Sequence, residues 1–310
     1  MIVCCGEALI DFLPRISTEG AAVYRPFCGG SIYNTAIALG RLGVDTGLFT
    51  GISGDFFGDQ LREGLTASKV DLKYIKSSTY PSMLAFVKLE GGQARYSFFN
   101  ENSASRMLTR KDLPKLAAKV RALHFGSISL IAEPGATTLE ALMRRERKTR
   151  VICLDPNIRP TVIENRRAYL ARVGRMIGLC DIVKISDEDV AWMTGRKDAA
   201  AAARKWLKAG AGIVAVTKGG EGVEAFTARY AIRLPSVPVT VADTVGAGDT
   251  FTAGLLAALA RAGKLDKKSL AAISENDLRE ALSFAARAAA ITVSRPGADP
   301  PWAHELDVSG

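Results

Sequence analysis

The sequence predicts an α/β protein built on a mostly parallel sheet. Short apolar runs of strand length alternate with alanine-rich or amphipathic runs of helix length, and this alternation is regular from Val120 onward. Several of the strand-like runs are apolar throughout, which is typical of parallel strands covered on both faces. At 310 residues, of which 48% are hydrophobic, the chain can bury a large core. One α/β domain with an insertion fits this length as well as two domains do.

Composition and charge limit the classes of function. The net charge is +9, from 41 Lys and Arg against 32 Asp and Glu. The basic residues concentrate in helix-like stretches such as 144–148 and 166–167 without interleaved aromatic residues, which is typical of solvated helix faces and not of nucleic-acid grooves. The N-terminal run does not resemble a signal peptide, and no apolar run reaches about 18 residues. We therefore expect a soluble cytoplasmic protein without nucleic-acid or membrane partners.

The usual catalytic groups based on histidine or cysteine cannot be assembled from this chain. The two histidines are His124, inside an apolar run, and His304, near the C-terminal end. The five cysteines have no zinc spacing, and four lie in or beside apolar runs, where cysteine acts as a small hydrophobic residue. We expect His124 in the core or behind the site, and neither a zinc site nor a hydrolase triad.

The first predicted strand ends beside two acidic residues. Residues 1–5 form an apolar run that predicts a buried strand, and Glu7 and Asp11 follow it. In open α/β sheets, ligands bind at the edge formed by the carboxyl ends of the strands. Asp11 is therefore a candidate ligand contact, although a solvent-facing acid in an alternating strand fits its position equally well.

A glycine pair introduces the first helix. Gly29 and Gly30 precede a predicted helix at 32–42, and such a pair lets a ligand approach the backbone closely. Asn34, one turn into the helix, could bind a sugar hydroxyl, or it could be a capping or surface residue. The motif is not a P-loop, since no G-x-x-x-x-G-K-[ST] occurs in the chain.

A hairpin interrupts the alternation that follows. Residues 44–51 predict a strand and residues 58–68 a helix. Two β-rich runs, 82–89 and 95–99, are then joined by a turn that contains two glycines. The aromatic residues at the end of this hairpin make it a candidate lid over a site, and an ordinary edge hairpin is the alternative.

Polar residues follow each strand of the second half. Since the carboxyl ends of parallel strands meet at one edge, these residues converge there, and this convergence predicts a site. The strands are predicted at 122–125, 151–154, 182–185 and 213–216, and the polar segments after them are 126–127, 155–159, 186–189 and 217–222. A long alanine-rich helix at 275–292 should pack beside the helix that starts near Asp249.

The segment 243–251 combines glycines with an acid at a helix start. An extended approach, 237–241, leads to Gly246 and Gly248 and then to a helix-forming run at 250–260. Backbone N–H groups at a helix N-terminus attract anions, and a carboxylate at Asp249 would repel a phosphate. The conflict is resolved if Asp249 takes a proton from a group that attacks the phosphate. Helix capping and a tight turn are the alternatives.

Two separated motifs carry a family resemblance. Residues 243–251, Asp-Thr-Val-Gly-Ala-Gly-Asp-Thr-Phe, resemble the C-terminal signature of the ribokinase-like (pfkB-type) sugar kinases. Residues 29–36, Gly-Gly-Ser-x-x-Asn-x-Ala, resemble the N-terminal signature of that family. The likeness extends from Cys5 to Ala298, and the stretches 155–160 and 183–188 are most like the fructokinase branch.

The resemblance implies a fold and a reaction. The fold would be a three-layer α/β/α domain spanning residues 1–310, with a small β lid from the segments 11–27 and 82–100, through which members often form homodimers. The reaction would be ATP-dependent phosphorylation of a sugar hydroxyl, with Asp249 as the general base. The N–H groups of Gly246, Ala247 and Gly248 would form the anion hole. Such a site supplies mainly positioning and charge stabilisation, which phosphoryl transfer requires.

The resemblance also implies which residues contact the ligands. These ligands would be the sugar, ATP with Mg²⁺, and a K⁺ ion. The implied sugar contacts are Asp11, Gly29, Gly30, Asn34, Phe99, Glu133, Arg159 and Asp249. The implied nucleotide contacts are Lys184, Ser186, Thr217, Lys218, Gly219, Gly220, Gly222, Gly246, Gly248 and Ala286. Asp189 would act on Mg²⁺, and a K⁺ site would involve Asp243, Val245, Thr292, Arg295 and Gly297.

The chain departs from the family pattern at three places. The family's Asn-x-x-Glu motif is Ser186-x-x-Asp189 here, the lid hairpin lacks an aspartate soon after its aromatic residues, and Pro301 stands where some relatives have a serine near the K⁺ site. We expect conversion of fructose to fructose 6-phosphate. A 2-keto-3-deoxygluconate kinase, a ribokinase or a nucleoside kinase is the alternative, and a non-catalytic sugar-binding protein is an alternative of another class.

Overall fold

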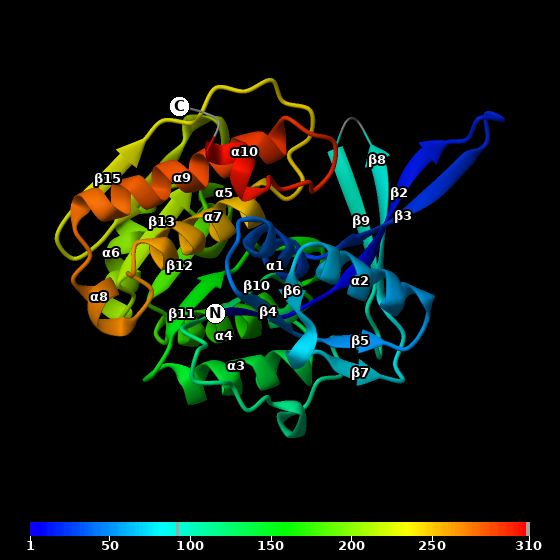
Figure 1. Cartoon of the computed structure of the whole chain (residues 1–310), viewed down its shortest axis with the longest axis horizontal. Coiled ribbons are helices and arrows are strands. Elements are labelled where there is room, and N and C mark those ends of the chain that lie inside the picture. Colours follow the sequence, from blue (N-terminus) through cyan, green and yellow to red (C-terminus); the bar gives the residue numbers. More distant parts are fainter. Residues whose placement is uncertain (91–92, 308–310) are drawn as a thin grey trace.

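A nine-stranded sheet forms the centre of the computed structural model, which describes residues 1–90 and 93–307 (Figure 1). The strand order is β15-β14-β13-β12-β11-β10-β1-β4-β6. All neighbours pair in parallel except β13 with β14 and β14 with β15. The strands are β1 Ile2–Cys5, β4 Thr46–Phe49, β6 Val70–Asp71, β10 Ala122–Gly126, β11 Val151–Asp155, β12 Ile182–Ser186, β13 Ile213–Thr217, β14 Val223–Phe226 and β15 Ala231–Leu234.

Helices cover both faces of this sheet, which confirms the predicted α/β class. Successive residues of β1 belong to opposite core clusters, because side chains alternate between the faces of a strand. One face is covered by α1 (Ser31–Arg41), α2 (Phe56–Ala67), α7 (Ala247–Arg261) and α9 (Glu275–Val293). The other is covered by α3 (Gly135–Glu146), α4 (Arg166–Ile177), α5 (Asp187–Thr194) and α6 (Ala199–Ala209).

The packing of α7 on α9 is close enough to require a small residue. A Cβ atom at Gly254 of α7 would lie 2.7 Å from the Cα atom of Ala285 on α9. Two alanine-rich helices can approach in this way because little side-chain volume separates their backbones. The contact holds α7 against α9 and so helps to fix the position of its first turn. The short helices α8 (Lys267–Ala271) and α10 (Ala303–Asp307) complete the C-terminal part.

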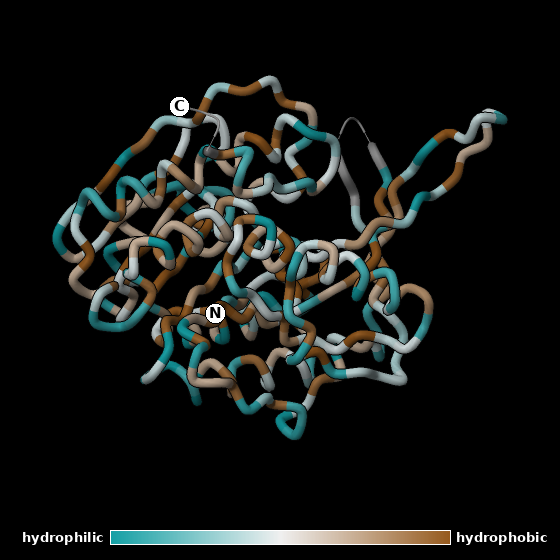
Figure 2. The backbone as a smooth tube through the Cα atoms, viewed as in Figure 1, coloured by the Kyte–Doolittle hydropathy of each residue, from teal (hydrophilic) through white to brown (hydrophobic). Residues whose placement is uncertain are grey.

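A second sheet of four strands, which we call the lid, projects from the α/β body (Figure 1). Its order is β3-β2-β8-β9, and β2 pairs in parallel with β8. Hydrophobic and hydrophilic residues alternate along its projecting strands (Figure 2). The turn predicted at 90–93 falls partly on residues 91–92, outside the described residues. The lid strands are β2 Leu9–Ile16, β3 Ala22–Gly29, β8 Met83–Glu90 and β9 Gln93–Phe99.

Some elements differ from the sequence prediction. The strand predicted at 44–51 is broken after Phe49, and its last residue begins β5 (Gly51–Ser53), which pairs with β7 (Lys76–Ser78) in a two-stranded sheet. The segment 237–241, which was predicted only as an extended approach to the helix, lies outside the sheets, and its Pro238 has no N–H to give to a strand ladder. Within the described part of the chain, no helix combines the length and apolarity that a membrane crossing requires.

Candidate active site

Asp249 lies in the first turn of α7, at the carboxyl edge of the sheet. Gly246 precedes the helix in the left-handed region, with φ 77°, a conformation that glycine adopts without steric cost. The first N–H groups of a helix have no acceptor within the helix, so those of this turn can face a ligand. The N–H of Ala247 donates weakly to the carbonyl oxygen of Thr244, at 3.3 Å. The carboxylate of Asp249 is buried beside these amides.

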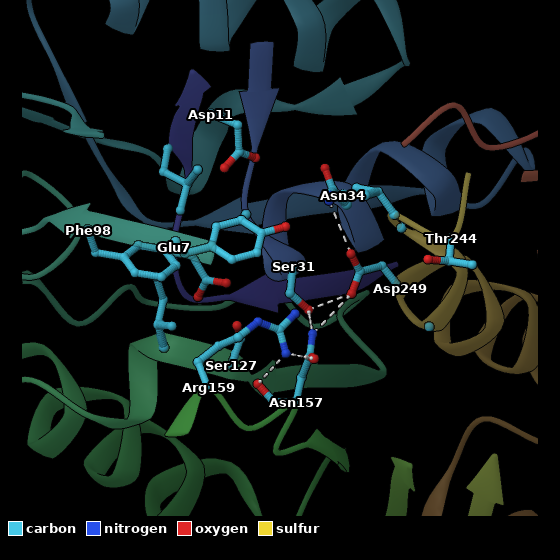
Figure 3. Close-up of a pocket in the computed structure, with 17 residues that line it drawn as sticks. Glu7, Asp11, Ser31, Asn34, Phe98, Ser127, Asn157, Arg159, Thr244 and Asp249 are labelled. Carbon is cyan, nitrogen blue, oxygen red and sulfur yellow. Dashed lines mark hydrogen bonds between the residues drawn. The ribbon is translucent and has the colours of Figure 1, made fainter. Parts of the chain in front are cut away.

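Three side chains donate hydrogen bonds to the Asp249 carboxylate (Figure 3). Ser31 Oγ lies 2.6 Å from Oδ1, and Asn34 Nδ2 lies 3.1 Å from Oδ2. Asn157 Nδ2 is also 3.5 Å from Oδ1. The sequence predicted Asn34 as a sugar contact, but it did not predict Ser31 or Asn157. Both missed residues lie inside recognised motifs, and no spacing in the sequence indicates that they meet Asp249.

Burial raises the pKa of Asp249 above its ordinary value. Hydrogen bonds from Ser31 and Asn34 oppose this effect because they stabilise the ionised form, as does the positive charge of Lys184, whereas Asp155 adds to it. The result is a carboxylate that is more basic than a surface aspartate. A buried carboxylate of raised basicity beside free backbone amides suits proton abstraction next to an anion.

A cavity of about 350 Å³ opens in front of Asp249 (Figure 3). The body supplies its floor, and the lid supplies the opposite wall. The residues lining it are Glu7, Leu9, Asp11, Gly30, Ser31, Asn34, Tyr96, Phe98, Ser127, Ile128, Asn157, Arg159, Thr244, Val245, Gly246, Gly248 and Asp249. Four of the predicted sugar contacts, Asp11, Gly30, Asn34 and Arg159, therefore line one cavity together with Asp249.

Asp11 reaches the cavity from β2 of the lid. Burial raises its pKa to about 7, and the guanidinium of Arg159 opposes that rise. Gly29 does not line the cavity, but a Cβ atom there would lie 2.1 Å from Oδ2 of Asp11. The absence of a side chain at Gly29 thus leaves room for the Asp11 side chain. Gly29 was predicted to contact the sugar itself.

The structure does not bring Phe99 and Glu133 to this cavity. Side chains alternate along β9, so Tyr96 and Phe98 face the cavity while Phe99 lies on the other face and is 61% exposed. Of this adjacent pair, Phe98 lines the cavity and the predicted Phe99 does not. Glu133 accepts from the N–H of Thr137 and forms an ion pair with Arg172, so its carboxylate caps α3.

A second cavity of about 430 Å³ lies on the other side of the α7 N-terminus. It is lined mainly by small and apolar side chains, a surface suited to a flat organic ring. Its residues are Thr217, Gly219, Gly220, Gly222, Val223, Ser236, Val237, Pro238, Val239, Val241, Thr244, Ala247, Gly248, Phe251, Ala286, Ala289, Ala290 and Val293. Thr217, the three glycines of 219–222, Gly248 and Ala286 were predicted here, whereas Gly246 lines the first cavity.

Three other predicted nucleotide contacts line neither cavity. Lys218 Nζ pairs with Glu224 at 2.7 Å, because the two face each other beside the β13–β14 ladder. Ser186 caps α5, accepting from the N–H of Asp189. Lys184 is buried in β12, where its Nζ lies 2.8 Å from Asp155 Oδ2.

Lys184 nevertheless lies directly beneath the first turn of α7. A Cβ atom at Gly248 would be 3.0 Å from Lys184 Nζ. Burial works to lower the pKa of Lys184, but the carboxylate of Asp155 outweighs it and the pKa is raised. The ammonium group therefore stays charged under the helix mouth and adds to the positive field of the backbone amides. His124 is buried in β10, two strands away from β12, and burial lowers its pKa to about 4.

The two cavities meet at the N-terminus of α7. Thr244 and Gly248 line both, so a molecule in either cavity contacts the same turn of chain. Asp249 belongs to the first cavity. A group held in the first cavity and a phosphate held at the turn would therefore face each other across the glycines. This arrangement can transfer a phosphoryl group between two bound molecules.

Asp189 is the residue that was predicted to act on Mg²⁺. Asp189 Oδ2 accepts from the N–H of Ile158 at 3.2 Å, and burial with the nearby charge of Asp155 raises the pKa of Asp189 to about 6. Among the described histidine, cysteine, aspartate and glutamate residues, no group of three or more is placed to hold a metal ion by itself. Asp155 Oδ1 is buried without a partner in the described chain.

The residues predicted for K⁺ lie near one another. Asp243 accepts hydrogen bonds from the N–H groups of Val245, at 3.0 Å, and Gly297, at 2.9 Å. The carbonyl of Thr292 accepts from the N–H of Arg295 at 3.1 Å. The 243–245 segment is thus joined to the segment after α9, and its carboxylate oxygens already accept protein hydrogen bonds.

Comparison with known proteins gives the same family over the whole length. The model of the pfkB family carbohydrate kinases matches residues 1–305. A fructokinase of Rhizobium leguminosarum bv. trifolii is 51% identical over 279 residues, covering 90% of this chain and 86% of that protein. A fructokinase of Klebsiella pneumoniae is 33% identical over 297 residues, covering 94% and 93%.

Solved structures agree with this assignment. A fructokinase from Xylella fastidiosa with bound ATP has a TM-score of 0.90 at 27% identity, with 98% of this chain and 96% of that chain covered. A double mutant of a fructokinase from Vibrio cholerae O395, with fructose, ADP and potassium ion bound, has a TM-score of 0.84 at 25% identity, covering 96% and 93%. This chain belongs to the pfkB family, has the ribokinase-like fold and is a carbohydrate kinase.

Proposed function

We propose that this kinase transfers the γ-phosphoryl group of ATP to the 6-hydroxyl of fructose, with Asp249 as the general base. The observation that carries the proposal is the meeting of the two cavities at Thr244 and Gly248, next to Asp249. Fructose would occupy the cavity between lid and body. ATP would occupy the apolar cavity beside α9, with its phosphates at the α7 N-terminus.

The reaction follows from these positions. The Asp249 carboxylate accepts the proton of the sugar hydroxyl, and the hydroxyl oxygen forms a bond to the γ-phosphorus. The bond between that phosphorus and the β–γ bridging oxygen breaks, and ADP carries the electron pair away. The N–H groups of Gly246, Ala247 and Gly248 stabilise the charge on the transferring group, as does Lys184 from below. Lid side chains exclude water, which would otherwise compete with the sugar.

The residues near the phosphates fit a Mg²⁺ ion held mainly by the nucleotide and water. Mg²⁺ in kinases uses one or two carboxylates besides phosphate oxygens and keeps several waters. Burial and, after it, the charge of Asp155 raise the pKa of Asp189, and a nearby cation would favour its ionised form. We propose that Asp189 contacts the ion through water. When bound, Mg²⁺ supplies positive charge that offsets that of the phosphates.

The charge of the first cavity favours a neutral acceptor. Glu7, Asp11 and Asp249 are acidic, whereas Arg159 is the cation among the lining residues. Arg159 Nη1 donates to Asn157 Oδ1 at 2.6 Å, so part of its capacity is already used. An acidic acceptor such as 2-keto-3-deoxygluconate would face three carboxylates, whereas the hydroxyls of fructose can donate to them. The fructokinases among the relatives support the same substrate.

A substrate panel tests the proposal. Fructose, ribose, 2-keto-3-deoxygluconate and a nucleoside would each be offered with ATP and Mg²⁺, with and without K⁺, and ADP formation measured. We expect the largest kcat/KM for fructose. A higher value for another acceptor would replace fructose as the substrate. Saturable sugar binding without phosphorylation with any nucleotide would favour the non-catalytic sugar-binding protein. The complete 246–249 turn argues against that alternative.

We also propose a cytoplasmic homodimer that forms through the outer face of the lid. Phe86 contacts Tyr24, with ring centroids 5.4 Å apart, and Phe99, at 5.5 Å. Tyr24 and Phe99 are both exposed, so an aromatic face is open to a second copy. Light scattering coupled to size exclusion should give twice the mass of the chain, and Phe99→Glu should give the monomer. A wild-type monomer at micromolar concentration would contradict the proposal.

A further inference from the structure

A continuous row of hydrogen bonds leads from Arg159 to Asp249 at the floor of the first cavity (Figure 3). Arg159 Nη1 lies 2.6 Å from Asn157 Oδ1, and Asn157 Nδ2 lies 2.8 Å from Ser31 Oγ. Ser31 Oγ lies 2.6 Å from Asp249 Oδ1. The four side chains come from the segment after β11, from the start of α1 and from the start of α7, so the row joins three separate elements.

The chemistry of its ends fixes the direction of every bond in this row. A guanidinium group can only donate, and an ionised carboxylate can only accept. The amide of Asn157 must therefore turn its oxygen to Arg159 and its NH₂ group to Ser31. The hydroxyl of Ser31, which accepts from Asn157, gives its single hydrogen to Asp249. Neither an amide flip nor a hydroxyl rotation preserves all three bonds.

The backbone conformation of Asn157 gives independent support for a functional role of this row of hydrogen bonds. Asn157 has φ 40°, in the left-handed region that residues other than glycine adopt at a cost. Such conformations persist where the surroundings require them, and they cluster at functional sites. Asparagine tolerates this region better than most residues. The conformation directs its amide to both Ser31 and Arg159.

We propose that Ser31, oriented by Asn157 and Arg159, is a positioning residue that orients the carboxylate of Asp249 and leaves Oδ2 as the oxygen that takes the proton. The proposal rests on the role of Asp249 as the base. Each carboxylate oxygen has two lone pairs. Oδ1 accepts from Ser31 and Asn157, whereas Oδ2 accepts from Asn34 within the described chain and keeps a lone pair for the sugar hydroxyl.

Ser31 also sets the acidity of the base. A hydroxyl that donates to a carboxylate favours its ionised form, and this contact opposes the effect of burial on the pKa of Asp249. The other charged groups that act on Asp249 are Asp155 on β11, Lys184 on β12 and Asp11 on β2. Arg159 faces Asp11 across the same cavity. Replacing Ser31 with alanine leaves all of these groups in place.

The test is the pH dependence of kcat for Ser31→Ala between pH 5 and 9, at saturating fructose and ATP. Loss of a hydrogen bond to a charged group should move the acid limb up by about one pH unit. At pH 9, where the base is ionised again, kcat should return to within about threefold of wild type. Ser31→Thr, which keeps a hydroxyl, should restore the wild-type limb. Ser103→Ala, which removes a buried hydroxyl that has no partner in the described chain, is the matched control.

Asn157→Gly provides a second variant, since glycine accepts the backbone conformation while removing the amide. It should move the limb in the same direction, because Ser31 is then free to rotate and the weak contact of Asn157 Nδ2 with Oδ1 is lost, and it tests the row of hydrogen bonds if Ser31→Ala does not fold. A kcat for Ser31→Ala lowered equally at all pH values, or left unchanged, would overturn the proposal. Asp249→Asn with nearly full activity would instead overturn the role of Asp249 itself, so the two failures are distinguishable.

Discussion

Asp249→Asn changes the proposed base while keeping its size. Asparagine cannot accept a proton at neutral pH, so the variant loses general-base catalysis, which is typically worth about 10²–10⁴-fold. The geometry adds to this loss. Ser31 and Asn157 can still donate to an amide oxygen placed like Oδ1, but the NH₂ group then faces Asn34 Nδ2, which lies 3.1 Å from Oδ2. Turning the amide moves this donor conflict to Asn157 Nδ2, because Ser31 can accept from an NH₂ group but the NH₂ group of Asn157 cannot, so one contact fails in either orientation.

Stability should change in the opposite direction to activity. The folded-state pKa of Asp249 is raised, so the folded protein holds the proton more tightly than the unfolded chain does. Stability therefore falls as pH rises from the unfolded pKa through the folded pKa, and ionised Asp249 costs stability at neutral pH. Asparagine removes that cost. We expect a Tm at pH 7.5 no lower than wild type despite the donor conflict, and a smaller advantage at pH 4.

The assay couples ADP formation to NADH oxidation, with calorimetry for the binding of fructose and ATP. We expect kcat to fall by about 10³-fold while both dissociation constants stay within about threefold of wild type. Asp249→Ala serves as the comparison, because it removes the contacts to Ser31 and Asn34 as well as the base. Activity of Asp249→Asn within a factor of about two of wild type would refute the reasoning.

Three further predictions concern the surroundings of the base and the fold. Arg159→Ala should raise the KM for fructose about tenfold and leave that for ATP nearly unchanged; equal increases would remove Arg159 from the sugar site. Gly248→Ala should lower kcat about tenfold or more, because its Cβ atom would lie 3.0 Å from Lys184 Nζ and displace the turn; wild-type kcat would show that the turn tolerates the methyl group. Hydrogen bonds from Arg175 and Arg144 lower the pKa of Glu140 to about 2. Ionised Glu140 therefore stabilises the fold above its unfolded pKa, and this stabilisation is lost as pH falls from about 5 to 2. Urea unfolding of Glu140→Gln should thus show destabilisation at pH 7 that disappears near pH 2, and a pH-independent difference would contradict this.

The parts of the site that were predictable are those at strand ends. Apolar runs that end in glycine or polar residues indicate parallel strands, and parallel strands bring those residues to one edge. This reasoning placed Asp11 and Arg159 at one edge, whereas the glycines at two helix starts and the family resemblance indicated Asn34 and Asp249; all four line the first cavity. The glycines of 219–222 also follow a predicted strand, but their contact with the nucleotide was implied by the resemblance; they line the second cavity.

The parts that were missed depend on registers and long-range contacts. Phe98 and Phe99 are adjacent, and the choice between them requires the face on which each lies, which a shift of one residue reverses. Ser31 and Asp249 are 218 residues apart, so their hydrogen bond has no local signal in the sequence. Lys184 was assigned to the nucleotide from its motif, but its position in β12 buries it against Asp155. The carboxylate of Glu133 is satisfied by the first turn of α3, which it precedes, and by Arg172.

The junction between β3 and α1 separates the two parts of the molecule that line the first cavity, the lid and the body. β3 ends at Gly29 and α1 begins at Ser31, so Gly30 alone, with φ 101°, connects the lid to the helix. Asp11 belongs to the lid, whereas the partners of Asp249 belong to the body. Substitutions along β2 and β9 can therefore alter which sugar is accepted without altering the orientation of the base. In a protein built in this way, substitutions in the lid sheet can change the substrate while the body keeps the same catalytic groups.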